Sequence, residues 1–263
     1  MTIHPSAVID PKAELGADVT IGPYCVIGSH VRLGDRVHLV AHVAIDGRTN
    51  IGAGTQIYPF ACLGHRPQDL KYHDEPSTLE IGENNQIREY VTMNPGTEGG
   101  GMVTKVGNNG LFMIGVHVAH DCHVGNNVIM SNNATLAGHV HVEDYAIIGG
   151  LSAVHQFVRI GAHAMIGGMT GVGRDVIPYG IVRSGEGHLA GLNIIGLERR
   201  GFDRKEIHAL RAAYKMLFGV SEGTIMERLN GVESNFKESS LVMDVVAFLR
   251  ARDARPICQP LED

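Results

Sequence analysis

The chain has 263 residues, a formal net charge of −6, 34 glycines, no tryptophan and only 5% aromatic residues. Large side chains therefore do not fill its interior, which disfavours an α/β enzyme with a bulky core and favours a repetitive fold with a narrow core. The acidic balance argues against a general nucleic-acid-binding protein, because such proteins are usually basic.

A period of six residues dominates the first two thirds of the chain. An aliphatic residue occupies every sixth position over residues 3–63, and an apolar residue does so again over 81–93 and 106–172. Neither a helix nor a hairpin has this period. Hexapeptide repeats are typical of a parallel β-helix, in which each face contributes one short strand and one inward side chain. We therefore predict a mainly β domain, a parallel β-helix, over residues 1–189.

The period also predicts which residues are neighbours in space. Three faces of six residues make a coil of about 18 residues, so positions 18 apart should stack in adjacent coils about 4.8 Å apart. Two stretches interrupt the repeat, near residues 66–78 and 98–104, and we predict that both are loops inserted into the coils. Such insertions often form the binding surface of a solenoid, and the alternative is a tolerated surface loop.

Beyond Pro178 the repeat fades, and we predict a small helical C-terminal domain over residues 190–263. Asp203 and Glu206 have the spacing of a capping box. They precede a stripe of apolar residues with a period of 3.6 over 207–218, which indicates an amphipathic helix.

Two serine-containing pairs, Ser221–Glu222 and Ser239–Ser240, have the character of further helix starts. Basic residues gather around the first helix, and such a surface is either a solvated face or a contact for a phosphate or an acidic protein. These residues are Arg199, Arg200, Arg204, Lys205, Arg211 and Lys215.

The cysteines and the N-terminus indicate the compartment. Cys25, Cys62, Cys122 and Cys258 show neither a CxxC pair nor a Cys/His ligand spacing, so we predict no disulfide framework and no metal site. The first residues lack the regions of a signal peptide, and no window reaches the roughly 18 apolar residues of a membrane span. We therefore expect a cytoplasmic protein without a membrane span or a cofactor.

A cluster of histidines around one aspartate is the strongest chemical signal. With a coil of about 18 residues, His120 lies beneath Gly138 and Gln156, and Asp121 lies beneath His139. A neutral imidazole can remove a proton near neutral pH, a carboxylate can orient it, and a glycine amide can donate to an oxyanion. This set suits acyl transfer by general base without a covalent intermediate. The alternative is a ladder of histidines and asparagines that only links the coils.

Five segments resemble one family closely. They are QDLKY at 68–72, HVAHDC at 117–122, NNATLAGH at 132–139, AVHQF at 153–157 and ERRGF at 198–202. The chain is similar over essentially its whole length to the UDP-N-acetylglucosamine O-acyltransferases that begin lipid A synthesis. The resemblance implies a left-handed β-helix, and transfer of an (R)-3-hydroxyacyl chain from acyl carrier protein to the glucosamine 3-hydroxyl of UDP-GlcNAc. It also implies a homotrimer with active sites between neighbouring β-helices.

The resemblance further implies roles for individual residues. His120 matches the family's general base, Asp121 its partner and Gly138 the oxyanion amide. Gly168 matches the position that limits acyl length, and a glycine there implies a long chain. The basic C-terminal surface suits an acidic carrier protein. The positions that match other substrate contacts are Gln68, Asp69, Lys71, His117, His139, His155, Gln156, Asn193, Arg199 and Arg200.

Two departures from the family pattern bear on the substrate. Residues 93–97 read MNPGT where the family has IHRGT, and Ile195 stands where many relatives carry a glutamate. Asn94 cannot ionise near neutral pH, and Pro95 removes a guanidinium and an amide donor. An alternative acceptor is therefore a UDP-sugar with a 3-amino group, which would give an amide.

Two rival functions remain. The N-acyltransferase of the same pathway carries an extra N-terminal domain, for which a repeat that begins at Ile3 leaves no room. A β-helix that is not an acyltransferase, such as a carbonic-anhydrase-like scaffold, is a less favoured possibility.

Overall fold

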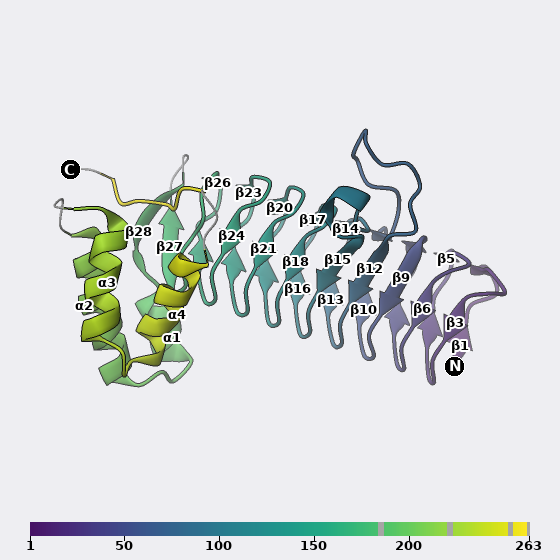
Figure 1. The fold of residues 1–263 in the computed structure, drawn as a ribbon. Helices are drawn as coiled ribbons and strands as arrows, with labels where there is room; N and C mark the ends of the chain where they lie inside the picture. The colour runs from purple at the N-terminus through teal and green to yellow at the C-terminus, as the bar shows by residue number, and fades with distance from the viewer. Residues whose placement is uncertain (184–186, 220–222, 252–254, 262–263) are drawn as a thin grey trace.

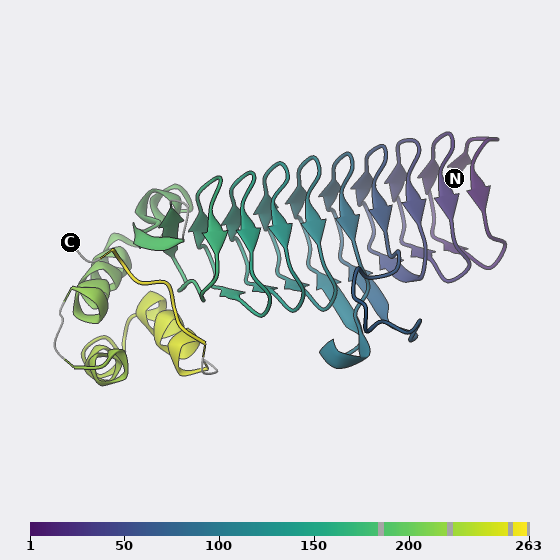
Figure 2. The ribbon, with the colours of Figure 1, turned by 90° about the horizontal axis from the view of Figure 1, so that it is seen from above.

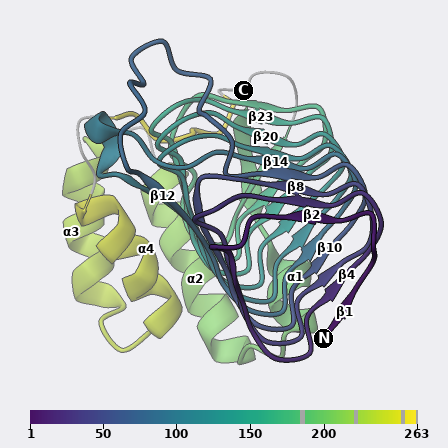
Figure 3. The ribbon, with the colours of Figure 1, turned by 90° about the vertical axis from the view of Figure 1, so that its right-hand side faces the viewer.

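The computed structural model describes residues 1–183, 187–219, 223–251 and 255–261. The described residues up to Leu192 form a three-sided left-handed solenoid of short strands, the predicted parallel β-helix, and four helices follow among the described residues at its C-terminal end (Figure 1). The view along the solenoid shows the three sides and a loop that projects from one corner (Figure 3).

Each side of the solenoid is one sheet. The first sheet contains β1 (Thr2–Ile3), β4 (Thr20–Ile21), β7 (His38–Leu39), β10 (Gln56–Ile57), β13 (Gln86–Ile87), β16 (Leu111–Phe112), β19 (Ile129–Met130), β22 (Ile147–Ile148), β25 (Met165–Ile166), β27 (Gly180–Arg183) and β28 (His188–Leu192). The second contains β2 (Val8–Ile9), β5 (Val26–Ile27), β8 (Ala44–Ile45), β11 (Cys62–Leu63), β14 (Thr92–Met93), β17 (His117–Val118), β20 (Thr135–Leu136), β23 (Ala153–Val154) and β26 (Gly171–Val172). The third contains β3 (Glu14–Leu15), β6 (Arg32–Leu33), β9 (Arg48–Ile51), β12 (Thr78–Ile81), β15 (Val103–Val106), β18 (His123–Val124), β21 (His141–Val142) and β24 (Arg159–Ile160).

The strands pair as the period predicts. His117 of β17 lies opposite Thr135 of β20, and Val118 lies opposite Leu136, a register of 18 residues between parallel strands. The spacing is longer where an inserted segment intervenes, as between Gln56 and Gln86, and shorter in the last parallel pair, between Met165 and Ile181. The pair β27–β28 at the end of the solenoid is antiparallel, which the repeat did not predict.

The core follows from the sixth-position residues. From Ile21, which is 1% exposed, to Val172, also 1% exposed, these side chains point inward and stack between coils. Ile3 is 42% exposed, because no coil covers the N-terminal end of the stack. Apolar residues two positions earlier, such as Val19, Val37 and Val128, are also fully buried, and together these side chains form one continuous core along the axis in which each coil contacts its neighbours.

The corners are built from residues with a left-handed backbone. Asp121, His139 and Phe157 have φ of 59°, 61° and 65°, and they occupy the same corner in successive coils. The rings of His139 and Phe157 stack there at 4.3 Å between centroids. Aspartate and histidine tolerate this backbone region better than branched residues do, which accounts for polar side chains at the corners.

Four helices complete the described chain: α1 (Ile194–Arg199), α2 (Arg204–Phe218), α3 (Ile225–Asn235) and α4 (Ser240–Arg250). Ser239 caps α4, as predicted, by accepting from the amide of Val242. The predicted pair Ser221–Glu222 lies outside the described residues. Helix α3 begins after Thr224, which forms a capping box with Glu227.

The capping box predicted at the start of α2 is wrong. Asp203 does cap the helix, through the amide of Lys205 at 2.6 Å. Glu206, however, accepts from the hydroxyl of Ser239 at 2.7 Å and from the amide of Leu241 at 3.2 Å. Its carboxylate therefore stabilises the N-terminus of α4 instead of its own helix, a tertiary contact that takes the place of the local one.

The helices are fixed to the end of the solenoid by polar contacts. The hydroxyl of Tyr179 donates to Asp244 of α4, and the guanidinium of Arg159 lies 4.3 Å from the ring centroid of Phe248 while its Nε donates to Asp175. In the described part of the chain, no helix has the length and apolar character that a bilayer crossing requires.

Candidate active site

Three successive coils have turns of different lengths at one corner, where the chain passes from the second sheet to the third. We call these turns the insertion corner. The segment 64–77 between β11 and β12 and the segment 94–102 between β14 and β15 both project there (Figures 1 and 2). In the next coil the same corner is the short turn 119–122 between β17 and β18, which contains His120 and Asp121. The two predicted loops and the histidine cluster are therefore neighbours.

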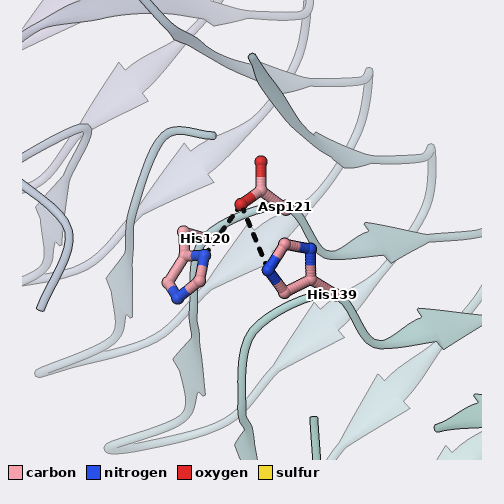
Figure 4. A group of neighbouring side chains, drawn as sticks. All are labelled: His120, Asp121 and His139. Carbon is pink, nitrogen blue, oxygen red and sulfur yellow. Dashed lines mark hydrogen bonds and ion pairs between the residues drawn. The ribbon is translucent and has the colours of Figure 1, made fainter. Parts of the chain in front are cut away.

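His120 and Asp121 form a buried hydrogen-bonded pair. Nδ1 of His120 lies 2.8 Å from Oδ2 of Asp121, and the residues are 7% and 2% exposed (Figure 4). Because an ionised carboxylate only accepts, Nδ1 carries the hydrogen and Nε2 retains its lone pair. Nε2 of His139 lies 3.8 Å from the same oxygen. This tautomer is the one that a general base acting through Nε2 requires.

The hydrogen bonds keep Asp121 ionised. Burial alone raises the pKa of this carboxyl, but hydrogen bonds from His120 and from Thr97 outweigh burial and leave the pKa below its ordinary value. Thr97 belongs to the neighbouring coil, and sequence reasoning did not find it. Thr104 is a second missed contact, since its hydroxyl accepts from the amide of Asp121 at 2.8 Å.

Gly138 lies against the imidazole of His120, as the 18-residue stacking requires. A Cβ added to Gly138 would lie 2.5 Å from Cε1 and 2.7 Å from Nε2 of that ring. Its carbonyl accepts from the amide of Phe157, while no hydrogen bond from its own amide is found among the described residues. The amide is therefore available to an oxyanion beside the imidazole.

Two other histidines predicted to belong to the site, His117 and His155, differ in burial. Nδ1 of His117 lies 2.8 Å from the hydroxyl of Thr92, and burial, followed by the proximity of His120, lowers the pKa of His117. His155 and Gln156 are exposed at the same corner further along the solenoid, with Nδ1 of His155 3.1 Å from the carbonyl of Gln156. Among the described residues, neither is a hydrogen-bond partner of the buried pair.

The inserted loop 64–77 has a fixed shape. Arg66 donates to the carbonyl of Tyr72 and pairs with Asp74 at 3.4 Å, and Tyr72 is 8% exposed. Leu70, at the tip, is fully exposed. The predicted substrate residues Gln68, Asp69 and Lys71 lie on this loop, where Asp69 accepts from the amide of Lys71 at 3.0 Å.

Asn94 holds the base of this loop. Its Nδ2 donates to the carbonyls of His65 and Arg66 at 2.9 and 3.3 Å, and its Oδ1 is buried without a partner among the described residues. Burial is the main cause that lowers the pKa of His139, and the charges of Asp121 and, to a smaller extent, of Asp69 in the loop oppose it. Asn94, one of the residues that depart from the family pattern, thus stabilises the inserted loop through these hydrogen bonds.

The remaining predicted residues lie elsewhere on the chain. Asn193, Ile195, Arg199 and Arg200 line a cavity of ≈ 730 Å³ together with outward side chains of the first sheet such as Met165. The carboxamide of Asn193 is used within the chain, since it accepts from the amide of Gly196 and donates to the carbonyl of His163. A single chain therefore does not bring this group to the insertion corner, which lies between the other two sheets.

Gly168 lies at a third place, the turn between β25 and β26 that joins the first sheet to the second. A Cβ added there would meet only the backbone of Gly150, with its carbonyl at 3.2 Å. The space beyond Gly168 is otherwise open.

One group of ligand atoms in the described residues could hold a metal ion: those of His120, Asp121 and His139 lie within 4.8 Å of one another. Both oxygens of Asp121 already accept short hydrogen bonds from Thr97 and His120. This donor set fits a hydrogen-bonded dyad.

Comparisons with known proteins agree over nearly the whole chain. A family model described as UDP N-acetylglucosamine O-acyltransferase, domain 2, matches residues 175–258, and a bacterial transferase hexapeptide model matches 1–35 and 12–47. Acyl-[acyl-carrier-protein]–UDP-N-acetylglucosamine O-acyltransferases from Rickettsia canadensis (strain McKiel) and Rickettsia rickettsii (strain Sheila Smith) are 58% and 60% identical to it, over 97% and 98% of this chain and 97% of each relative. The crystal structure of the UDP-N-acetylglucosamine O-acyltransferase from Moraxella catarrhalis RH4 is 38% identical with a TM-score of 0.95, over 98% of this chain and 100% of that one.

Proposed function

The chain belongs to the family of acyl-[acyl-carrier-protein]–UDP-N-acetylglucosamine O-acyltransferases, and we propose that it transfers an (R)-3-hydroxyacyl chain from acyl carrier protein to the 3-hydroxyl of UDP-GlcNAc, the first step of lipid A biosynthesis. The observation that carries the mechanism is the buried pair of His120 and Asp121 beside the free amide of Gly138. The basic residues on and beside α2 suit an acidic carrier protein.

The geometry supports the following sequence of steps. Nε2 of His120 removes the proton of the sugar 3-hydroxyl while its oxygen attacks the thioester carbonyl of the acyl donor. The amide of Gly138 donates to the oxyanion that forms, and Asp121 stabilises the imidazolium through Nδ1. The intermediate then collapses: the C–S bond breaks, the ester remains on the sugar, and the imidazolium returns its proton to the departing thiolate.

The two separated groups of residues support an assembly of several copies. His120 lies at the insertion corner, while Arg199 lines the cavity beside the first sheet of the same chain. A copy placed against its neighbour can bring one chain's insertion corner to the other's cavity. We propose that the site is completed in this way in a homotrimer, and that UDP-GlcNAc and the carrier arm bind between the two surfaces.

Mixed assemblies test this arrangement. His120→Ala and Arg199→Ala homotrimers should each have little activity, whereas coexpressed mixtures should regain it, because some interfaces then combine an intact His120 with an intact Arg199. The measurement is the turnover of purified mixed trimers against each parent. Absence of any recovery would show that both groups act within one chain. The Arg199 side chain is exposed at the surface of a single chain, so its removal should leave the fold intact.

The reaction itself is tested by an acyl-transfer assay with the purified protein. It offers 3-hydroxyacyl carrier proteins of several lengths to UDP-GlcNAc and to its 3-amino analogue. We expect an ester product from UDP-GlcNAc and a preference for a long chain, because Gly168 leaves the adjoining space open. Product from the amine alone would assign this chain to an amide-forming acceptor, and a preference for short chains would contradict the role of Gly168.

The cysteines are consistent with the setting of such a reaction. All four are free thiols, and Cys25, Cys122 and Cys258 are buried. We propose a reducing, cytoplasmic location on this basis, since proteins of oxidising compartments usually pair their cysteines.

A further inference from the structure

The segment 94–102 reaches back to the dyad from the preceding coil. The amide of Thr97 donates to Oδ1 of Asp121 at 2.7 Å, and its hydroxyl donates to Oδ2 at 2.6 Å. Oδ2 also accepts from Nδ1 of His120 at 2.8 Å. Thr97 thus contacts both oxygens of the carboxylate and fixes the plane in which Oδ2 meets the imidazole.

The same segment closes the carboxylate off from water. A Cβ added to Gly100 would lie 1.9 Å from Cγ of Asp121, so the backbone of this turn packs directly against the carboxylate. Thr97 is 5% exposed and Asp121 is 2% exposed. Hydrogen bonds to a buried charge are stronger than those in water, and the loss of one partner is correspondingly costly.

We propose that Thr97 is a positioning residue of the acyl transfer: its hydroxyl and amide hold Asp121 in the orientation that fixes the tautomer and direction of the His120 imidazole. Thr97 does not contact the reacting atoms and acts only through Asp121. The proposal rests on the general-base function proposed for His120.

A purely structural role is the competing explanation, because the segment 94–102 also holds the inserted loop. The amide of Glu98 donates to Glu75 at 3.0 Å, and Asn94 binds the base of the loop. Thr97 could simply fix the segment and, through it, the substrate-binding loop. The two roles predict different kinetics: a loss of loop order raises the KM for the sugar, whereas a misplaced dyad lowers kcat and alters the pH dependence.

The sign of the pH effect follows from charge. The reaction requires the dyad without its extra proton, so the acid limb of the pH profile of kcat/KM reports proton uptake by the pair. Removal of the Thr97 hydroxyl takes one donor from the carboxylate, and the pair then binds a proton more tightly. The acid limb should therefore move to higher pH, whichever residue receives the proton. Other titratable or charged groups around the pair, unchanged by the substitution, are His117, Cys122, His123, His139, Asp69 and Lys105.

The experiment measures kcat, KM and the pH profile for the full-length enzyme, Thr97→Val and Thr97→Ser. Thr97→Val should lower kcat by about 10- to 100-fold, the equivalent of one hydrogen bond to a charged group, with the acid limb at higher pH and little change in KM. Thr97→Ser keeps the donor and should recover most of the rate and the original limb. If Thr97→Val does not fold, Thr97→Ala serves for the same test, because alanine also removes the hydroxyl and places no methyl group against the carboxylate of Asp121.

The matched control is Thr55→Val. Thr55 is also a buried threonine, and in another part of the solenoid its hydroxyl donates to the carbonyl of Gly82 at 3.1 Å and accepts from the amide of Asn85 at 3.2 Å. This variant should keep the wild-type pH profile.

The outcomes separate the two proposals. If Thr97→Val has an unchanged acid limb and a raised KM for the sugar, Thr97 has only a structural role and the inference is overturned. If His120→Ala is inactive while Thr97→Val matches the wild type, only the positioning role fails. If His120→Ala retains turnover, the general-base mechanism fails and the positioning role fails with it.

Discussion

His120→Ala should lower kcat by about 10²- to 10⁴-fold, the usual cost of removing a general base. The imidazole is the group whose Nε2 lone pair remains free once Nδ1 donates to Asp121 at 2.8 Å. Cys122 follows closely in sequence but is no substitute nucleophile, because it is buried and burial raises its thiol pKa to about 12. Steady-state turnover of the purified variant measures the effect.

The control for this substitution is His141→Ala. His141 lies on the outer face of the third sheet, where its ring contacts that of His123 at 4.7 Å between centroids with the two planes tilted by 42°. It belongs to a histidine ladder between coils and should tolerate alanine with nearly full turnover. Both variants should keep the wild-type assembly and Tm, and turnover of His120→Ala within a few-fold of the wild type would contradict the mechanism.

The parts of the site that the sequence predicted are those where the repeat is uninterrupted. From residue 106 to residue 172 each coil adds 18 residues, as the pairing of His117 with Thr135 shows. Sequence position then converts directly into spatial position, because a solenoid coil contacts only its neighbours. For this reason the repeat alone places Gly138 against His120, and His139 near Asp121.

Thr97 could not be placed in this way. It bonds Asp121 across 24 positions, and the insertion that follows it breaks the 18-residue register between these coils. The same limit explains the capping of α4 by Glu206, which bonds Ser239 across 33 positions and has no periodic relation to it. Local patterns predicted the helices themselves. Contacts between elements that are far apart in the sequence depend on how these elements pack in three dimensions, and the repeat does not encode that packing.

The 18-residue stacking alone gave no indication that the candidate residues form two groups on one chain, although the family resemblance implied active sites between neighbouring β-helices. The family resemblance implied that Arg199 and His120 serve one site, yet they lie on different sides of the solenoid. The direction in which each face points becomes visible only once the three sheets are in place. The separation is then itself an argument for the proposed assembly of copies.

Gly138→Ala should be nearly as damaging as the loss of the base, with kcat reduced by about 10²-fold, the cost of misplacing a catalytic group by about 1 Å. The added methyl would lie 2.5 Å from Cε1, 2.7 Å from Nε2 and 3.1 Å from Nδ1 of His120, so the imidazole must move. The backbone at Gly138 has no positive φ, and alanine is therefore free of conformational strain there. The expected loss comes from the contact with the ring, and kcat of the purified variant measures it.

Gly173→Ala is the matched control, because a methyl group there meets nothing within 4 Å and the backbone again has no positive φ. This variant should keep its turnover. Full activity in Gly138→Ala would show that neither the placement of His120 nor its close approach to this backbone matters for catalysis.

The double variant separates displacement of the base from damage to the oxyanion site. Alanine at position 138 keeps the amide N–H, and in the His120→Ala background the space of the imidazole is empty, so the methyl group has room. Gly138→Ala should then cost little beyond His120→Ala alone, a strongly non-additive result for two residues that act through one contact. A second full loss in the double variant would instead show that the methyl group blocks the approach of the acyl carbonyl to the amide. In that case the oxyanion role of Gly138 would account for its loss independently of the base.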